Sequence, residues 1–154
     1  MRTRTILASL AVFFAGFALC FAADPQIGTW KLNEAKSKLS PGATKNNTVV
    51  YAAAGDNVKV TVDGIGGDGK PVHHEWTGKF DGKDYPVTGD PSGDSRSYKK
   101  VDDRTIEFTG KQGGKVTVTG RVVVAADGKS RTVTASGTDS KGTKIAITAV
   151  YDKQ

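Results

Sequence analysis

Alternation of apolar and polar residues constrains the fold of this chain more than any other feature. In "VKVTVD" (58–63) the three valines fall on one face, while Lys59, Thr61 and Asp63 fall on the other, which is the two-residue period of a β-strand. The same period recurs in "VHHEWTGKF" (72–80), "KVTVTGRVVV" (115–124) and "KIAITAVY" (144–151). Valine and threonine, which suit half-buried pleated positions, fill these runs. The chain therefore predicts an all-β fold.

Short turns rich in glycine and aspartate separate the runs. Asp-Gly pairs at 68–69, 81–82 and 127–128 and Gly-Gly at 113–114 are typical of hairpins, because primed turns need positive φ angles. The runs predict about ten strands, near residues 26–33, 46–54, 57–64, 71–80, 84–88, 95–101, 104–110, 115–125, 130–138 and 143–152. The interval 34–42 could instead hold one helical turn, which would begin after Asn33 and end before Pro41.

The connections are too short for crossover helices, so each strand should pair antiparallel with its neighbours in the sequence. A meander of this length commonly removes its edges by closing on itself. We therefore predict an antiparallel up-and-down β-barrel of about 8–10 strands. A twisted open sheet or a β-sandwich is the alternative.

The N-terminal segment has the layout of a secretory signal. Arg2 and Arg4 precede an unbroken apolar run, residues 6–23, and Cys20 and Ala22 form a small-residue cleavage pair. The segment predicts a signal peptide over 1–22, a single domain over 23–154 and a periplasmic or secreted protein. A retained membrane anchor or a lipoprotein attached at Cys20 is the alternative, although Leu19 is large for a lipoprotein site.

Composition narrows the chemistry of the mature chain. Removal of Arg2 and Arg4 from the 22 basic residues leaves 20 against 16 acidic ones, a net charge of +4 that favours solubility more than an anionic partner. The only cysteine leaves with the signal, so the mature chain has no disulfide and no thiol nucleophile. We expect no nucleic-acid partner, no stable membrane insertion after signal removal, and a monomer.

Short motifs at both ends add a family resemblance. "GTWKL" (28–32) resembles the first-strand signature of the calycins, which include the lipocalins and the intracellular fatty-acid-binding proteins, and "VYDK" (150–153) resembles the last strand of the fatty-acid-binding branch. The chain also resembles small secreted bacterial proteins with "GTWKLN", "GKFDGKDYPVTG" and "AVYDKQ", and that likeness spans most of 26–154. The resemblance implies a lipocalin-like barrel. The last-strand Arg-x-Tyr clamp for a carboxylate is absent, because Ala149-Val150-Tyr151 stands there.

In calycins an arginine side chain characteristically covers the first-strand tryptophan and closes one end of the barrel. In an up-and-down meander all odd-numbered strands begin at the same end, so Arg131 should lie inward at the end where Trp30 lies. The resemblance thus makes Trp30 and Arg131 the barrel-closing pair. The alternative is an exposed Arg131, and we expect Arg121 to face solvent.

Inward positions are mostly valine, alanine and glycine, with few large side chains. A barrel of this size is either filled by side chains or holds one small ligand. If a cavity exists, alternation predicts the lining His74, Trp76, Phe80, Tyr98, Phe108 and Tyr151. The alternative is a narrow barrel that packs its small residues tightly.

Signals for catalysis, metals and cofactors are weak. His73 and His74 are adjacent, so on a strand they point to opposite faces and cannot share one ion. The aspartates at 81, 84, 90 and 94 do not have calcium-loop spacing and are typical of turns. We expect no metal, no cofactor and no catalytic residue. An enzyme would have to use His74 and Tyr151.

The sequence therefore favours an exported, non-enzymatic binding protein that holds a small, mostly apolar ligand inside a β-barrel. The alternative is a ligand-free structural or protein-interaction β-domain of the cell envelope.

Overall fold

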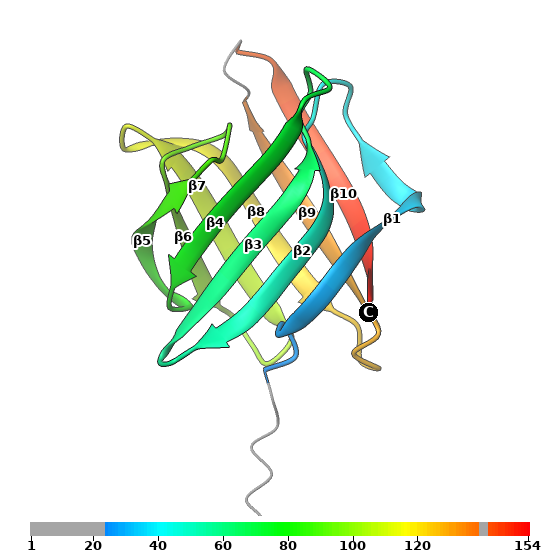
Figure 1. Ribbon diagram of the computed structural model, residues 1–154, viewed down its shortest axis with the longest axis vertical. Coiled ribbons are helices and arrows are strands. Elements are labelled where there is room, and N and C mark those ends of the chain that lie inside the picture. Colours follow the sequence, from blue (N-terminus) through cyan, green and yellow to red (C-terminus); the bar gives the residue numbers. More distant parts are fainter. Residues whose placement is uncertain (1–23, 139–141) are drawn as a thin grey trace, which may run out of the picture.

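The computed structural model describes residues 24–138 and 142–154, and the predicted signal segment 1–22 lies outside these residues. Ten strands follow one another: β1 (Gly28–Leu39), β2 (Lys45–Ala54), β3 (Asn57–Ile65), β4 (Pro71–Gly78), β5 (Asp81–Thr88), β6 (Ser95–Lys100), β7 (Thr105–Gln112), β8 (Lys115–Val124), β9 (Ser130–Thr138) and β10 (Lys144–Lys153). They form a closed barrel in which each strand pairs antiparallel with its sequence neighbours (Figure 1). The predicted all-β, up-and-down barrel is confirmed.

Pairing of β1 with β10 closes the barrel and leaves no free edge. Trp30 lies opposite Lys153 and Leu32 lies opposite Tyr151, so the motifs "GTWKL" and "VYDK" are adjacent strands of the closure. The residues described contain no helix long and apolar enough to cross a membrane.

The predicted helical turn after Asn33 is wrong, because β1 continues to Leu39. A β-bulge between Asn33 and Lys38 absorbs the irregular stretch. The Ser37 hydroxyl donates to the Asn33 carbonyl oxygen at 2.7 Å and accepts from the Val150 N–H at 2.9 Å. Pairing with β10 thus overrides a local sequence that suits a helix.

The two ends of the barrel differ. The Trp30 end is where β1 and the other odd-numbered strands begin, and the Asp90 end is the opposite one, where the turn between β5 and β6 lies (Figure 1). Inward side chains at the Trp30 end are sealed from solvent: Trp30, Val124, Ile106, Arg131 and Tyr151 are at most 4% exposed. At the rim of the Asp90 end, Ile145 and Ile147 are half-buried and Val116 is 58% exposed.

Candidate functional site

Arg131 lies at the Trp30 end inside a ring of aromatic side chains. Its guanidinium carbon is 4.7 Å from the centroid of the Trp30 ring, 4.6 Å from that of Tyr51 and 5.2 Å from that of Tyr151. Strand parity predicts the first contact, and Tyr51 joins it from β2. Such a cation–π contact contributes about 2 kcal/mol when it is shielded from water.

The N-terminal approach to β1 covers this cluster. The Trp30 indole N–H donates to the Gln26 carbonyl oxygen at 2.9 Å, and the Gln26 amide donates to the Arg104 carbonyl oxygen at 3.1 Å. Burial lowers the pKa of Arg131 and raises the pKa of Tyr151 to about 12. Among the residues described, Arg131 Nε and Nη1 are buried without a hydrogen-bond partner, so the aromatic side chains, with Tyr51 also a hydrogen-bond partner, hold this cation.

Aromatic rings pack together in the middle of the barrel. Trp76 is the hub of this aromatic cluster: its ring centroid is 4.7 Å from that of Tyr98, 6.4 Å from that of Phe80 and 5.7 Å from that of Tyr85. Phe108 extends the cluster from Tyr98, at 5.9 Å between centroids. Edge-on and tilted arrangements of this kind are favourable for aromatic pairs.

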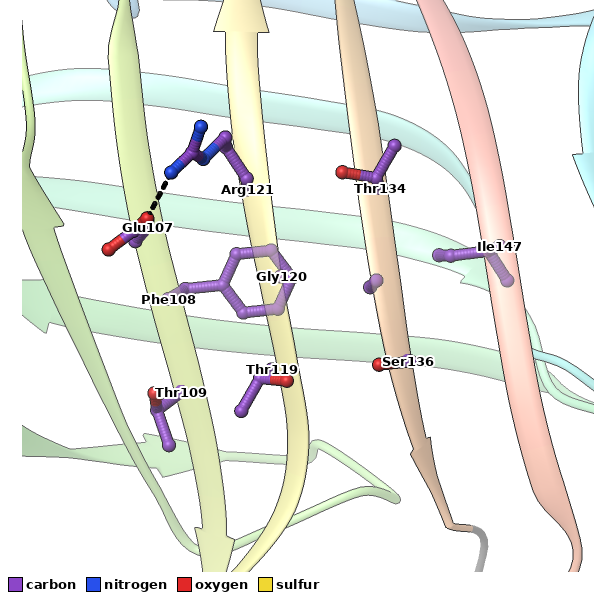
Figure 2. Close-up of a pocket in the computed structure, with 10 residues that line it drawn as sticks. Glu107, Phe108, Thr109, Thr119, Gly120, Arg121, Thr134, Ser136 and Ile147 are labelled. Carbon is purple, nitrogen blue, oxygen red and sulfur yellow. Dashed lines mark hydrogen bonds and ion pairs between the residues drawn. The ribbon is translucent and has the colours of Figure 1, made fainter.

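A glycine on the neighbouring strand makes room for Phe108. Gly120 pairs with Phe108 across β7 and β8, and a Cβ at Gly120 would lie 2.4 Å from the Phe108 ring carbon Cζ. Figure 2 shows the ring reaching across to Gly120. The small inward residue at this position therefore holds one of the protein's own aromatic rings.

A polar cluster lies between the aromatic cluster and the Asp90 end. Arg96 on β6 donates from Nη2 to Asp90 at 2.5 Å, and Trp76 donates its indole N–H to the Arg96 carbonyl oxygen at 2.9 Å. Ser92 donates its backbone N–H and its hydroxyl to the other carboxylate oxygen of Asp90, at 2.8 and 2.6 Å. The side chains of Arg96 and Asp90 are 11% and 3% exposed, so this ion pair is shielded from water.

His74 completes the polar cluster from β4. It is 3% exposed, and neither ring nitrogen has a hydrogen-bond partner among the residues described. Burial lowers the pKa of His74 to about 4, while Asp90 raises it and Arg96 lowers it further. The imidazole is therefore neutral at pH 7, with one N–H donor and one free nitrogen acceptor.

The predicted lining residues divide into three groups. Trp76, Phe80, Tyr98 and Phe108 lie together in the aromatic cluster, although Phe80 follows the end of β4. Tyr151 lies apart at the Trp30 end beneath Arg131, and His74 belongs to the polar cluster.

Sequence reasoning missed Tyr51, Arg96 and the inward role of Asp90. Arg96 is two residues from Tyr98 on β6, so alternation could have placed both on the inner face. Asp90 does shape its turn, as predicted, but its second oxygen binds Arg96. Arg121 is exposed and paired with Glu107, as alternation predicts.

Two hollows, of about 540 and 510 Å³, lie on the outer face of β7 to β10. Outward side chains such as Thr119 and Ser136 line both hollows, and the inward-facing Phe108, Gly120 and Ile147 also border the first. The Glu107–Arg121 ion pair borders the first hollow (Figure 2). Both hollows are open to solvent and mix polar with apolar residues, and Phe108 belongs both to the first hollow and to the aromatic cluster.

Few side chains of the described residues are candidates for metal binding or catalysis. Among the described residues, no group of three or more histidine, aspartate or glutamate side chains is placed to hold a metal ion. His73 is exposed and binds Asp63 at 2.6 Å, on the opposite face from His74.

No protein-family profile and no curated protein matches the chain. Among solved structures, EF1p2_mFAP2b bound to DFHBI has a TM-score of 0.51 and 14% sequence identity, over 86% of this chain and 97% of that chain. A redesigned beta barrel, mFAP1, bound to DFHBI has a TM-score of 0.48 and 16% identity, over 86% and 98%. At 14% identity the likeness to EF1p2_mFAP2b shows a shared fold alone.

Proposed function

We propose that this chain is a non-enzymatic binding protein that holds a small, mostly apolar ligand inside the barrel, reached from the Asp90 end. The observation that carries the proposal is the difference between the two ends. Trp30 and Arg131 seal one end, while half-buried Ile145 and Ile147 face inward at the rim of the other.

The interior has the composition of a small-molecule site. Such sites combine apolar and aromatic walls with a few polar groups that orient the ligand. Here the aromatic cluster supplies the walls, and His74 and Arg96 supply polar atoms that have no partner in the part of the chain that the structure describes. EF1p2_mFAP2b, a barrel of the same fold, is bound to DFHBI, which gives a precedent for a small molecule on this scaffold.

The cellular setting of the proposal comes from the sequence. We take residues 1–22 as a cleaved signal, which would deliver a soluble monomer to the periplasm or the exterior. N-terminal sequencing of the exported protein tests this. A mature chain that starts at Ala23 is expected, and a chain that keeps residues 1–22 would contradict export with cleavage.

Native mass spectrometry tests the binding function directly. The exported protein is measured under native and denaturing conditions, and an extra mass present in the native spectrum alone is the expected result. A bare protein mass, followed by no binding of N-phenyl-1-naphthylamine or of other apolar dyes, would contradict the proposal.

The outer hollows favour a second candidate, a β-domain that binds a protein partner through its outer face. The observation behind it is that Thr119 and Ser136, which pair across β8 and β9, line both hollows and so connect them. A Ser136→Trp variant that loses a partner while it keeps dye binding would support this candidate.

A further inference from the structure

The polar cluster offers a specific set of unused hydrogen-bonding atoms. Both ring nitrogens of His74 and the Nε of Arg96 are buried, and none of the three has a hydrogen-bond partner within 24–138 and 142–154. Buried polar atoms in native proteins are nearly always hydrogen-bonded, so a cluster of three without partners needs an explanation. His74 brings one N–H donor and one acceptor nitrogen, and Arg96 Nε brings one N–H donor.

These atoms belong to one continuous site. Gly89, which precedes Asp90, lies against the backbone of β4 at His74, and both Asp90 and Arg96 act on the pKa of the His74 imidazole. Asp90 in turn binds Arg96. A Cβ at Gly110 would lie 3.9 Å from Arg96 Nε and 2.6 Å from Val118 Cγ1, so Gly110 and Val118 border this nitrogen.

Local charge in the cluster is balanced. Asp90 compensates the Arg96 cation, and the His74 imidazole is neutral. An anionic group placed here would meet the Asp90 carboxylate, and an ammonium group would meet Arg96. A charged group would thus add an unpaired charge to a buried site, which is unfavourable.

We infer that the ligand presents an uncharged hydroxyl group, of an alcohol or a phenol, to His74 and Arg96; this inference rests on the proposed function. A hydroxyl has one O–H donor and two lone pairs. It therefore complements one acceptor nitrogen and two N–H donors. A carboxylate has no donor for the free His74 nitrogen, and a ketone has none either.

The apolar part of the ligand would lie against the neighbouring rings. Phe108 is next to this cluster, because the Arg96 guanidinium carbon lies 5.5 Å from its ring centroid. Trp76 lies on the same face of β4 as His74, two residues further along. The ligand is thus a hydroxyl-bearing apolar molecule, with its ring or chain against Phe108 and Trp76.

Three probes of one shape test the inference: naphthalene, 2-naphthol and 2-naphthoate, titrated at neutral pH, where 2-naphthol is uncharged and 2-naphthoate is an anion. N-phenyl-1-naphthylamine, titrated alongside them, reports whether the interior binds apolar molecules at all. We expect 2-naphthol to bind about tenfold more tightly than naphthalene, since it gains hydrogen bonds to buried groups. Naphthoate should bind no better than naphthalene.

Two variants assign the effect to the imidazole. His74→Phe keeps a ring of similar size and breaks no hydrogen bond within the protein, so it should fold and should bind naphthol and naphthalene equally. His74→Gln has one carbonyl acceptor and one amide donor group, and it should restore part of the preference for naphthol.

The outcomes separate this inference from the proposed function. If N-phenyl-1-naphthylamine binds but naphthol has no advantage, the His74 site holds a buried water molecule only, and the inference fails while the proposed function stands. Tighter binding of naphthoate than of naphthol would also overturn it. If neither N-phenyl-1-naphthylamine nor any naphthalene probe binds, the proposed function fails and the inference fails with it.

Discussion

The Arg131 guanidinium lies over the Trp30 indole, with its carbon 4.7 Å from the ring centroid, and the structure shows no carboxylate ion-paired with Arg131 among the described residues. Tyr51 and Tyr151 complete an aromatic enclosure around the cation. Because Arg131 is shielded from solvent, each cation–π contact stabilises the fold more here than it would at the surface. We call Arg131 with Trp30, Tyr51 and Tyr151 the plug, because these side chains close the Trp30 end of the barrel.

Replacement of Arg131 by lysine should destabilise the protein. Lysine keeps the charge but loses the planar group that stacks on Trp30, and its ammonium is more strongly hydrated. We expect a loss of about 2 kcal/mol in the free energy of unfolding, measured by chemical denaturation. The matched control is Arg121→Lys, at an exposed position on β8. This substitution should change the free energy of unfolding by less than about 0.5 kcal/mol. Equal effects of the two substitutions would argue against the plug.

His74 should make stability depend on pH. Its pKa is about 4 in the folded protein, against 6.5 for the unperturbed side chain. Between these pH values the unfolded chain therefore binds more protons than the folded protein does. The contribution of His74 to the free energy of unfolding is therefore fully present above pH 6.5. It is lost as the pH drops toward 4, by up to about 1.4 kcal/mol per pH unit.

The comparison of wild type with His74→Phe isolates this contribution from the carboxylates. Urea unfolding at several pH values between 4 and 7 should give a shallower loss of stability on acidification in His74→Phe. His73→Gln serves as the control, since His73 lies on the exposed face. A wild-type and a His74→Phe protein with the same pH dependence would refute a buried neutral His74.

Asp90→Asn should destabilise the protein strongly. The substitution leaves the Arg96 cation shielded from water and without its carboxylate. Removal of one partner of a buried pair typically costs about 3–5 kcal/mol. The double variant Asp90→Asn/Arg96→Gln, which removes both charges, should recover part of the loss. Thermal unfolding of the three proteins checks this, and an unchanged Asp90→Asn protein would show that the pair is solvated.

Gly120→Ala should also be destabilising, because its Cβ would lie 2.4 Å from the Phe108 ring and 2.6 Å from the Thr134 carbonyl oxygen. Overpacking of this kind costs about 1–3 kcal/mol. Adding Phe108→Leu should relieve the contact with the ring but not the one with Thr134. A double-mutant cycle measures the coupling, and strictly additive effects would contradict contact between Gly120 and Phe108.

Much of the fold was predictable because alternation and turn residues both indicate strands. Parity alone placed Arg131 at the Trp30 end, since odd-numbered strands of a meander begin together. The helical turn predicted within 34–42 is wrong because the helix-favouring residues there give no sign of the bulge that pairs Ser37 with β10.

The polar cluster could be predicted only in part. Alternation places His74 inside, and it could have placed Arg96 there. The inward turn of Asp90 is a tertiary feature, because the same residue would form an equally good exposed turn. That His74 lacks a partner depends on everything packed around it, so no local pattern indicates it.

One binding comparison tests the central claim most directly, namely that the ligand lies inside the barrel near the Asp90 end. N-phenyl-1-naphthylamine is titrated into wild type, Ile147→Trp and Ser136→Trp, with circular dichroism to check folding. Ile147 shares the inward face of β10 with Tyr151 but also borders the first hollow, whereas Ser136 is exposed and borders both hollows. Binding that Ile147→Trp weakens at least about tenfold, and that Ser136→Trp leaves unchanged, is the predicted result. Binding that Ser136→Trp abolishes would place the ligand on the outer wall and contradict the account, whatever the effect of Ile147→Trp.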